Sequence, residues 1–493
     1  MKRMLVGFFI LVLMLGVLLI NVSQGRAGEV LLARLVVQDR SDLDSLADLE
    51  LEVVNFRHPQ VGGAPLYILA NQAQLAAVTE AGFSVELIPG YLEGSTLYAF
   101  EIEAGRGVQL LTEIYPEAVV LVSEGEVALL MLPEAFSQEQ QQVSGRFKIL
   151  EPMPFYAPEA LSAVINSGEV ASETIVVYDP RIQAMIFGVE RDPLANLIAG
   201  LSGENPVTIN GNPYTILTRY SYAGIPINKA TAYTEEYLRN LGLETDFEYY
   251  EPFVGTEWRN VIAEQPGLTQ PQKIILLTAH IDSRSEIPMS YAPGADDNAT
   301  GTAGLLIAAN VLSQYPFEYT IRYVLFTGEE QGHYGSLDYA AQQRALGANI
   351  RAVINLDMIG YNSDASPVYE MHIRPSSIYP EDWEIATTLR DVVNIYSLGL
   401  TTQIVQDSWW ISDHDSFWDY GYPAVWVFED YENFNPYYHT TNDQIESVNK
   451  PYVRDIVRAA VGAAAHLAGV VDLKPTFLPG TWLAFIAGAP PQP

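Results

Sequence analysis

Three short segments of this chain carry histidine or carboxylate side chains directly after an apolar run. His280 and Asp282 follow KIILLTA, Glu329 and Glu330 follow YTIRYVLFTG, and Asp357 follows AVINL. Such runs favour strands buried on both faces, and ligands bind outside the carboxyl ends of the strands in open α/β sheets. Nitrogen and oxygen atoms that converge there could hold a divalent metal ion. The spacing therefore predicts a polar site at one edge of a sheet.

Two further segments add candidates for the same site. Asp297 lies in a loop before the helical pattern TAGLLIAANVL, and His439 lies in YYHTTNDQIE, before the last helical pattern. A metal-binding histidine usually donates its second ring N–H to a carboxylate, and Asp282 is two positions along from His280. One such residue would be ordinary on a solvated surface loop. Several such residues at corresponding positions after the strands indicate a metal site.

A divalent ion held at this edge could perform hydrolysis. Such an ion lowers the pKa of a bound water molecule and polarises a carbonyl group. A nearby carboxylate can take the proton of the water and pass it to a departing amine, which typically contributes about 10²–10⁴-fold in rate. Adjacent glutamates at a strand end point in different directions, so one of Glu329 and Glu330 can bind metal while the other faces the water.

An α/β domain over residues 173–472 is expected to position these side chains. Helical and apolar strand patterns alternate along it, which predicts a mostly parallel mixed sheet with helices on both faces. The expected strands are residues 258–265, 273–278, 319–327, 352–360 and 424–430. The expected helices are residues 181–201, 227–241, 301–314, 336–345, 381–395 and 453–467.

The region before this domain repeats one pattern twice. Residues 29–154 show the order βαββαβ in two passes, which predicts a smaller α+β domain with ferredoxin-like repeats. No cluster of histidine and acidic residues marks a site in it, so we expect a spacer, a folding aid or a propeptide. Residues 155–172 are predicted to be a linker, and residues 473–493, rich in Gly and Pro, a tail.

The composition limits the classes of partner that this protein can bind and the cellular compartment in which it is expected. The 493 residues include 60 acidic and 26 basic side chains, a net charge of −34, which argues against nucleic acid or an anionic membrane surface as a partner. Residues 1–28 read as a signal peptide or an uncleaved membrane anchor, which predicts export. No cysteine is present, so any metal must be held by nitrogen and oxygen atoms.

Six motifs occur in one characteristic order: TAHIDS, APGADDNATG, FTGEEQGHYGS, NLDMIGY, SDHDSF and HTTND. With these motifs, residues of about 173–470 closely resemble the secreted binuclear zinc aminopeptidases. This family includes bacterial leucyl aminopeptidases, yeast aminopeptidase Y and, more distantly, glutamate carboxypeptidase. The resemblance does not cover the repeats at the start of the chain.

The resemblance implies roles for individual residues. The implied ligands of two zinc ions are His280 and Asp357 for one, Glu330 and His439 for the other, and Asp297 as the bridge. Asp282 matches the partner of His280, and Glu329 matches the general base of the family. In the family the peptide bond after the bridging aspartate is often cis, which here is Asp297–Asn298.

A wall for an apolar substrate side chain is predicted from the dense aromatic residues between Trp409 and Tyr438, although core packing is the default for such residues. The residues predicted to line the substrate site are Met358, Trp409, Asp413, His414 and Phe434, and His333 is a further candidate. Trp409 and Trp410 stand where the bacterial leucyl enzymes carry a cysteine-flanked tyrosine, so side-chain preference is expected to differ. The remaining histidines, His58, His372 in a polar loop and His466 on a helix, are expected to be structural or exposed.

The resemblance thus implies a secreted metallo-exopeptidase that uses two zinc ions to remove amino-terminal residues, large apolar ones above all, from peptides. A carboxypeptidase or dipeptidase of the same fold is the nearest alternative. A related glutaminyl cyclase would use one zinc, whereas the implied ligand set is complete for two. A non-catalytic binding ectodomain is the alternative from another class, but such relatives lose ligands and none is missing here.

Overall fold

The computed structural model describes residues 176–472, apart from 254 and 407–410, and parts of the region before them. In that N-terminal region it describes residues 30–154 with gaps at 39, 48, 50, 55–63, 94, 102–117, 125–126, 133–145 and 151–152. The predicted signal peptide or anchor (1–28), linker (155–172) and tail (473–493) therefore lie outside the described residues.

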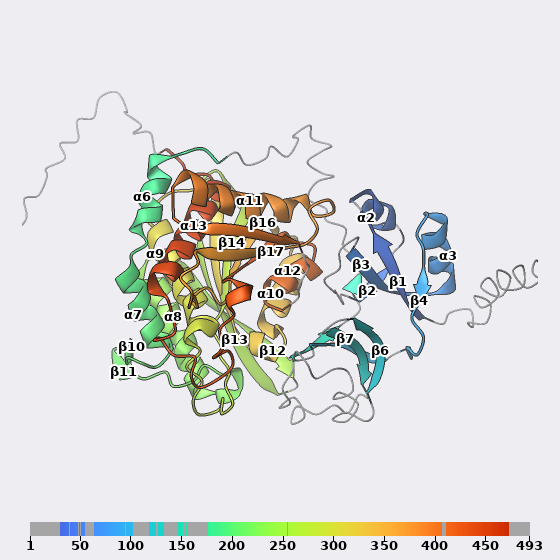
Figure 1. Ribbon diagram of the computed structural model, residues 1–493, viewed down its shortest axis with the longest axis horizontal. Coiled ribbons are helices and arrows are strands. Elements are labelled where there is room, and N and C mark those ends of the chain that lie inside the picture. Colours follow the sequence, from blue (N-terminus) through green and yellow to red (C-terminus); the bar gives the residue numbers. More distant parts are fainter. Residues whose placement is uncertain are drawn as a thin grey trace, which may run out of the picture.

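An eight-stranded mixed sheet forms the centre of the larger unit (Figure 1). Its order is β12-β13-β15-β14-β16-β19-β17-β18, and β14, β15, β16 and β19 run parallel to their neighbours in this group. The strands are β12 (Glu244–Phe253), β13 (Thr256–Gln265), β14 (Gln270–His280), β15 (Tyr319–Phe326), β16 (Asn349–Leu356), β17 (Val368–Ile373), β18 (Thr401–Gln406) and β19 (Ala424–Phe428). A short separate hairpin is made of β10 (Val207–Ile209) and β11 (Asn212–Tyr214).

Helices cover both faces of this sheet. One face carries α6 (Pro180–Gly188), α7 (Arg191–Leu201), α8 (Ile225–Asn240), α9 (Gly301–Leu312), α11 (Pro380–Ile395) and α13 (Lys450–Ala468), which pack on one another and on the strands. The other face carries α10 (Tyr334–Ala345) and α12 (His414–Asp419). The central strand β14 is apolar on both sides, since Ile275 and Leu277 pack in one core and Ile274 and Leu276 in the other. The predicted fold class of the domain is confirmed.

The N-terminal region contains two small antiparallel sheets. The first pass gives β1 (Leu31–Val37), α2 (Arg40–Ala47), β2 (Glu52–Val54), β3 (Ala64–Ala70), α3 (Gln72–Glu80) and β4 (Glu86–Leu87), in the sheet order β4-β1-β3-β2-β9. The second gives β5 (Thr96–Glu101), β6 (Val119–Glu124), β7 (Val127–Leu132) and β8 (Arg146–Leu150), in the order β6-β7-β5-β8. Apart from the added β9 (Met153–Pro154), both show the predicted ferredoxin-like strand order. The predicted helices of the second pass lie outside the described residues.

The first N-terminal sheet packs against the larger unit. Ile378, in the loop between β17 and α11, is 1% exposed and lies in the same apolar core as Leu35 and Leu43. Tyr379 and Tyr420 pack against this core from the same side. The N-terminal core is therefore completed by side chains of the larger unit.

Several sequence-based expectations were wrong in detail. The single helix expected over 181–201 is two helices, because the chain is extended at Val189 and Glu190 before Pro193 enters the first turn of α7. His372 was placed in a polar loop, but it lies in β17, is 1% exposed, and has its Nε2 2.9 Å from Glu370 Oε2. Strands β12, β17 and β18 were not expected, since polar residues interrupt their apolar pattern.

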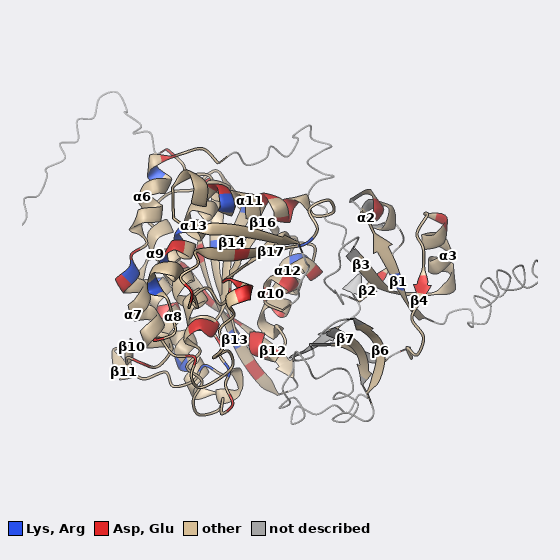
Figure 2. Cartoon of the chain, viewed as in Figure 1, with Lys and Arg blue, Asp and Glu red and all other residues tan. Residues whose placement is uncertain are grey.

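Acidic residues occur on many helices and strands of the described chain and are not gathered on one element (Figure 2). This distribution agrees with a solvated acidic surface for most of them. Within the described residues, no helix combines the length and the apolar character that crossing a bilayer requires.

Candidate metal centre

The predicted ligands come from five separate turns or strand ends of the larger unit. His280 is the last residue of β14, Asp357 follows β16, and Glu330 lies in the turn η4 (Glu329–Gln331), just after β15. Asp297 lies in η3 (Ala295–Thr300), before α9, and His439 lies in the loop before α13. Because β15, β14 and β16 are parallel neighbours, their carboxyl ends bring three of these side chains to one sheet edge.

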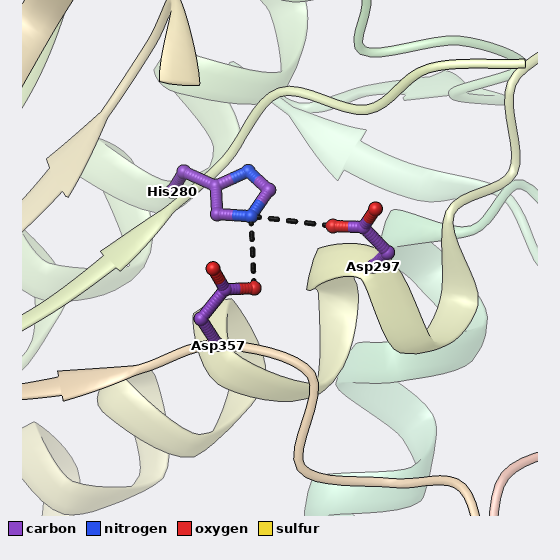
Figure 3. A group of neighbouring side chains, drawn as sticks. All are labelled: His280, Asp297 and Asp357. Atoms are coloured by element: carbon purple, nitrogen blue, oxygen red, sulfur yellow. Dashed lines mark hydrogen bonds and ion pairs between the residues drawn. The ribbon is translucent and has the colours of Figure 1, made fainter. Parts of the chain in front are cut away.

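One group of potential ligands consists of His280, Asp297 and Asp357 (Figure 3). His280 Nε2 lies 3.1 Å from Asp357 Oδ1 and 3.3 Å from Asp297 Oδ1, so one ring nitrogen faces two carboxylates. All three side chains are buried. The other ring nitrogen, Nδ1, lies 3.6 Å from Asp282 Oδ1, on the side expected for an orienting carboxylate.

The second group consists of Asp297, Glu330 and His439. His439 Nε2 lies 2.8 Å from Glu330 Oε2 and 3.3 Å from Asp297 Oδ2. Asp297 thus belongs to both groups and presents a different oxygen to each histidine. The His439 side chain is 20% exposed, whereas the other members are almost fully buried, so this group opens toward solvent.

The atoms of these groups fit a cation. Asp297 Oδ2, both carboxylate oxygens of Glu330, and His439 Nε2 are buried, and none has a partner in hydrogen-bond geometry within the described part of the chain. Buried charged atoms that face one another without well-aligned hydrogen bonds are costly unless a further ligand satisfies them. Imidazole nitrogens and carboxylate oxygens are the donors that zinc accepts in proteins without thiolates.

The electrostatics of the site favour positive charge. Burial lowers the pKa of His280, but the negative charges of Asp357 and Glu329 outweigh it and leave the pKa well above its ordinary value. Burial likewise opposes the charge of Asp297, yet the two facing histidines hold its pKa far below the usual range. A divalent cation would supply the positive charge that protons on these histidines would otherwise carry.

The turn that carries Asp297 is tightly held. Gly294, which precedes it, has φ +48°, and a Cβ there would lie 2.2 Å from the carbonyl oxygen of Asp297. The backbone N–H groups of Asp296 and Asp297 donate to the buried carboxylate of Asp443, at 3.1 and 3.0 Å. The Asp297–Asn298 peptide bond is cis, as the family resemblance implied.

Glu329 lies beside the second group but is not a member of either group. Gly328, with φ +78°, precedes it, and a Cβ at Gly328 would lie 2.9 Å from Trp258 and from the Tyr250 hydroxyl. Glu329 Oε1 lies 3.4 Å from His333 Nε2, and the backbone N–H of Glu329 donates to Asp282 Oδ1 at 3.3 Å. Glu329 and Glu330 thus have different surroundings, although their assignment as base and ligand stays a prediction.

An apolar surface adjoins the ligands. Met358, which follows Asp357 and has φ +51°, forms a buried cluster with Trp426 and Phe428 of β19. Tyr438 packs against this cluster, and its ring stacks on His439 with centroids 3.7 Å apart. Phe434, 38% exposed, packs against Tyr438. Met358 and Phe434 therefore lie on the same apolar side of the candidate ligands, and their role as a substrate wall stays a prediction.

The other predicted substrate residues differ in position. Asp413 and His414 are fully buried, and burial together with the charge of Glu329 raises the pKa of Asp413 well above its ordinary value. His414 stacks against Trp426 with ring centroids 5.6 Å apart and meets Trp418 edge-on, so it packs against the cluster of Met358, Trp426 and Phe428. Trp409 and Trp410 lie outside the described residues.

Sequence reasoning missed residues that orient the ligands. The hydroxyl of Ser412, which stands in the motif SDHDSF, donates to Asp357 Oδ2 at 2.5 Å and accepts from Asn355 Nδ2 at 2.8 Å. Asp443 stands within the quoted motif HTTND, so its motif position could have identified it. Ser221, which contacts Asp282, had no motif to mark it.

Comparison with known proteins agrees with this geometry. Residues 260–464 match the model described as peptidase family M28. The chain is 31% identical over 220 residues to aminopeptidase YwaD of Bacillus subtilis, covering 42% of this chain and 45% of that protein. It is 31% identical over 218 residues to leucine aminopeptidase 1 of Aspergillus niger, covering 42% of this chain and 55% of that protein. The chain thus spans about half the length of these relatives. The predicted family resemblance is confirmed.

The crystal structure of the Legionella pneumophila LapA aminopeptidase has the same fold. It aligns with a TM-score of 0.56 at 15% identity, covering 77% of this chain and all of that one. At this identity the likeness concerns the fold alone.

Proposed function

We propose that this chain, whose residues 260–464 match peptidase family M28, is an exported zinc aminopeptidase that removes large apolar residues from the amino termini of peptides. The observation that carries the proposal is the position of Asp297, whose two oxygens face two different histidines, each at 3.3 Å. A carboxylate in this position suits a bridge between two cations. The names of the relatives, aminopeptidase YwaD and leucine aminopeptidase 1, support the same reaction.

Two zinc ions would be held by the residues of the two groups. His280 and Asp357 would hold one, Glu330 and His439 the other, and Asp297 would contact both. Bound zinc supplies a Lewis acid that polarises a carbonyl group and makes a water molecule more acidic. Ser412 and Asp282 hold Asp357 and His280 in the orientation that the site needs.

Glu329 is the residue best placed to move protons. It is buried beside Glu330. The hydrogen bond from its backbone N–H to the Asp282 carboxylate fixes the backbone from which its side chain projects. In the proposed reaction its carboxylate takes a proton from the attacking water and delivers it to the departing amine. The apolar cluster of Met358, Trp426 and Phe428 suits a large apolar side chain next to the scissile bond.

Hydrolysis of Leu-p-nitroanilide by the metal-loaded protein tests this function. We expect turnover that is lost on treatment with a chelator and restored by zinc. The reason is that the proposed reaction depends on zinc, which the chelator removes from its nitrogen and oxygen ligands. N-acetyl-Leu-p-nitroanilide is the matched control and should not be hydrolysed, since it lacks the free amino group.

Other outcomes point to the alternatives. Activity on carboxyl-terminally free, amino-terminally blocked peptides would favour a carboxypeptidase. Loaded protein that hydrolyses neither kind of substrate would contradict the enzyme proposal and favour a binding ectodomain.

The division of the chain is part of the proposal: a leader at 1–28, an α+β domain at 29–154, a linker at 155–172 and a catalytic domain at 173–472. Strand β8 of the α+β domain lies close to the turn Glu329–Gln331, and the packing around Ile378 holds this domain on the catalytic one. These contacts support a propeptide that restricts access of long substrates to the site.

Cutting an engineered protease site within residues 155–172 tests the propeptide role. The protein also carries Ile378→Asp, which weakens the packing between the N-terminal domain and the catalytic domain. After the cut we expect the N-terminal fragment to separate on gel filtration. Turnover of a long peptide should then rise more than turnover of Leu-p-nitroanilide, because a small substrate needs less room. The uncut Ile378→Asp protein is the control. Unchanged turnover of the long peptide after separation would contradict the role.

A further inference from the structure

The segment 218–223, which includes the short helix η2 (Ser221–Ala223), contacts the metal centre from outside the part of the chain that matches peptidase family M28. It lies between β11 and α8, far from the motifs in sequence. Two of its side chains, Arg219 and Ser221, are buried at 0% and 2% exposure. Both bond to residues adjacent to the proposed ligands and base.

Ser221 joins two turns that carry functional side chains. Its hydroxyl donates to Asp282 Oδ2 at 2.9 Å and accepts the N–H of Gly328 at 2.9 Å. The other oxygen of Asp282 accepts the N–H of Glu329 at 3.3 Å and lies 3.6 Å from His280 Nδ1. Asp282, Ser221 and the Gly328–Glu329 backbone therefore form one closed set of hydrogen bonds.

Arg219 anchors this segment to the rest of the site. Its Nε donates to the carbonyl of Ile281 at 2.7 Å, and its Nη2 donates to the carbonyl of Gly294 at 2.8 Å. Nη1 donates to the carbonyls of Leu201 and Pro293. Ile281 follows His280, and Gly294 precedes the turn of Asp297, so one guanidinium fixes the segment to two ligand-bearing loops. Ser221 is thus held in place by contacts that do not involve its own hydroxyl.

Loss of the Ser221 hydroxyl would act on Glu329 in two ways. The N–H of Gly328 would lose its acceptor in a buried position, which is unfavourable unless the turn moves. The carboxylate of Asp282 would lose one of its donors and could rotate away from the N–H of Glu329. Catalytic groups must be held close to the productive geometry, and a displacement of about 1 Å can cost about 10²-fold in rate.

We propose that Ser221 is a positioning residue for Glu329: through Asp282 and the Gly328 backbone, it sets the direction from which this carboxylate reaches the attacking water. This inference rests on the proposed function. It assigns Ser221 no contact with substrate or metal. Its substitution should therefore change kcat rather than KM or zinc binding.

The test compares Ser221→Ala with Ser221→Thr, which keeps the hydroxyl, and with Ser202→Ala as a matched control. Ser202 is also buried, and its hydroxyl donates to the carbonyl of Ile198 at the end of α7. We expect Ser221→Ala to lower kcat about 10- to 100-fold, with KM for Leu-p-nitroanilide and bound zinc unchanged. Ser221→Thr should recover most of kcat, and Ser202→Ala should match the wild type.

Hydrogen–deuterium exchange gives a readout that does not require turnover. We expect the amides of residues 328 and 329 to exchange faster in Ser221→Ala than in the wild type, and no such change in Ser202→Ala. This measurement applies even if the wild type hydrolyses no substrate, a result that would contradict the proposed function alone.

Three results from kinetics and zinc analysis, and one from hydrogen exchange, would overturn the positioning role. One is an unchanged kcat in Ser221→Ala, and another is an equal loss of kcat in Ser202→Ala. The third is a loss of zinc in parallel with kcat, which would show that Ser221 acts on metal binding. Unchanged exchange of the 328 and 329 amides would also contradict the proposed contact.

Discussion

We expect the replacement of Glu329 by Gln to lower kcat for Leu-p-nitroanilide by about 10²–10⁴-fold while zinc binding is retained. The amide keeps the volume of the buried carboxylate but cannot accept the proton of the attacking water. Glu329 belongs to neither group of potential ligands, so zinc content should stay at the wild-type value. Steady-state kinetics and zinc analysis on the same preparation measure both quantities.

Glu244→Gln is the matched control for this substitution, because Glu244 is an exposed carboxylate at the start of β12. It should leave kcat and zinc content unchanged. A Glu329→Gln protein that has lost zinc would be a ligand variant, and the assignment of Glu329 as base would then be wrong.

Replacing Asp297 by Ala has the second large effect, on metal binding itself. Asp297 presents one oxygen to each group, so its removal should weaken zinc binding at both positions and abolish detectable turnover. The weakening should exceed the roughly 10–100-fold that follows from losing an outer hydrogen-bond partner of a ligand. Isothermal titration calorimetry with zinc measures the number of ions bound and their affinities.

Single-group variants provide the comparison for Asp297→Ala. Asp357→Ala removes a member of the first group only, and His439→Ala a member of the second only, so each should weaken one binding event and spare the other. Asp246→Asn, which changes an exposed acid on β12, should alter neither. If Asp297→Ala weakens only one event, Asp297 is not a shared ligand.

The proximity of the candidate ligands was largely predictable because these residues follow the strongest local signals in the chain. His280 and Asp357 follow apolar runs that are typical of buried strands, and the order of the motifs supplied the remaining members. Strand β14 is apolar on both faces and lies between β15 and β16, so its end had to meet theirs. The sheet thus explains why residues distant in sequence were expected together.

The residues that orient the site were less predictable, since their roles depend on tertiary contacts. Ser221 and Arg219 lie in a short segment with no periodic pattern, and the guanidinium of Arg219 donates to backbone carbonyls, which any sequence provides. Strand β17 was missed because Glu370 and His372 satisfy each other inside the core, where a polar side chain alone would argue against burial.

The pairing of β14 with both neighbours has a consequence for metal exchange. Backbone hydrogen bonds keep adjacent strands about 4.8 Å apart, whatever the side chains at their ends. Three of the five candidate donors, His280, Glu330 and Asp357, follow strands of this ladder, so the pairing of the strands sets the positions of their backbones. We therefore expect that replacing zinc by cobalt or manganese leaves the backbone at these three strand ends unchanged.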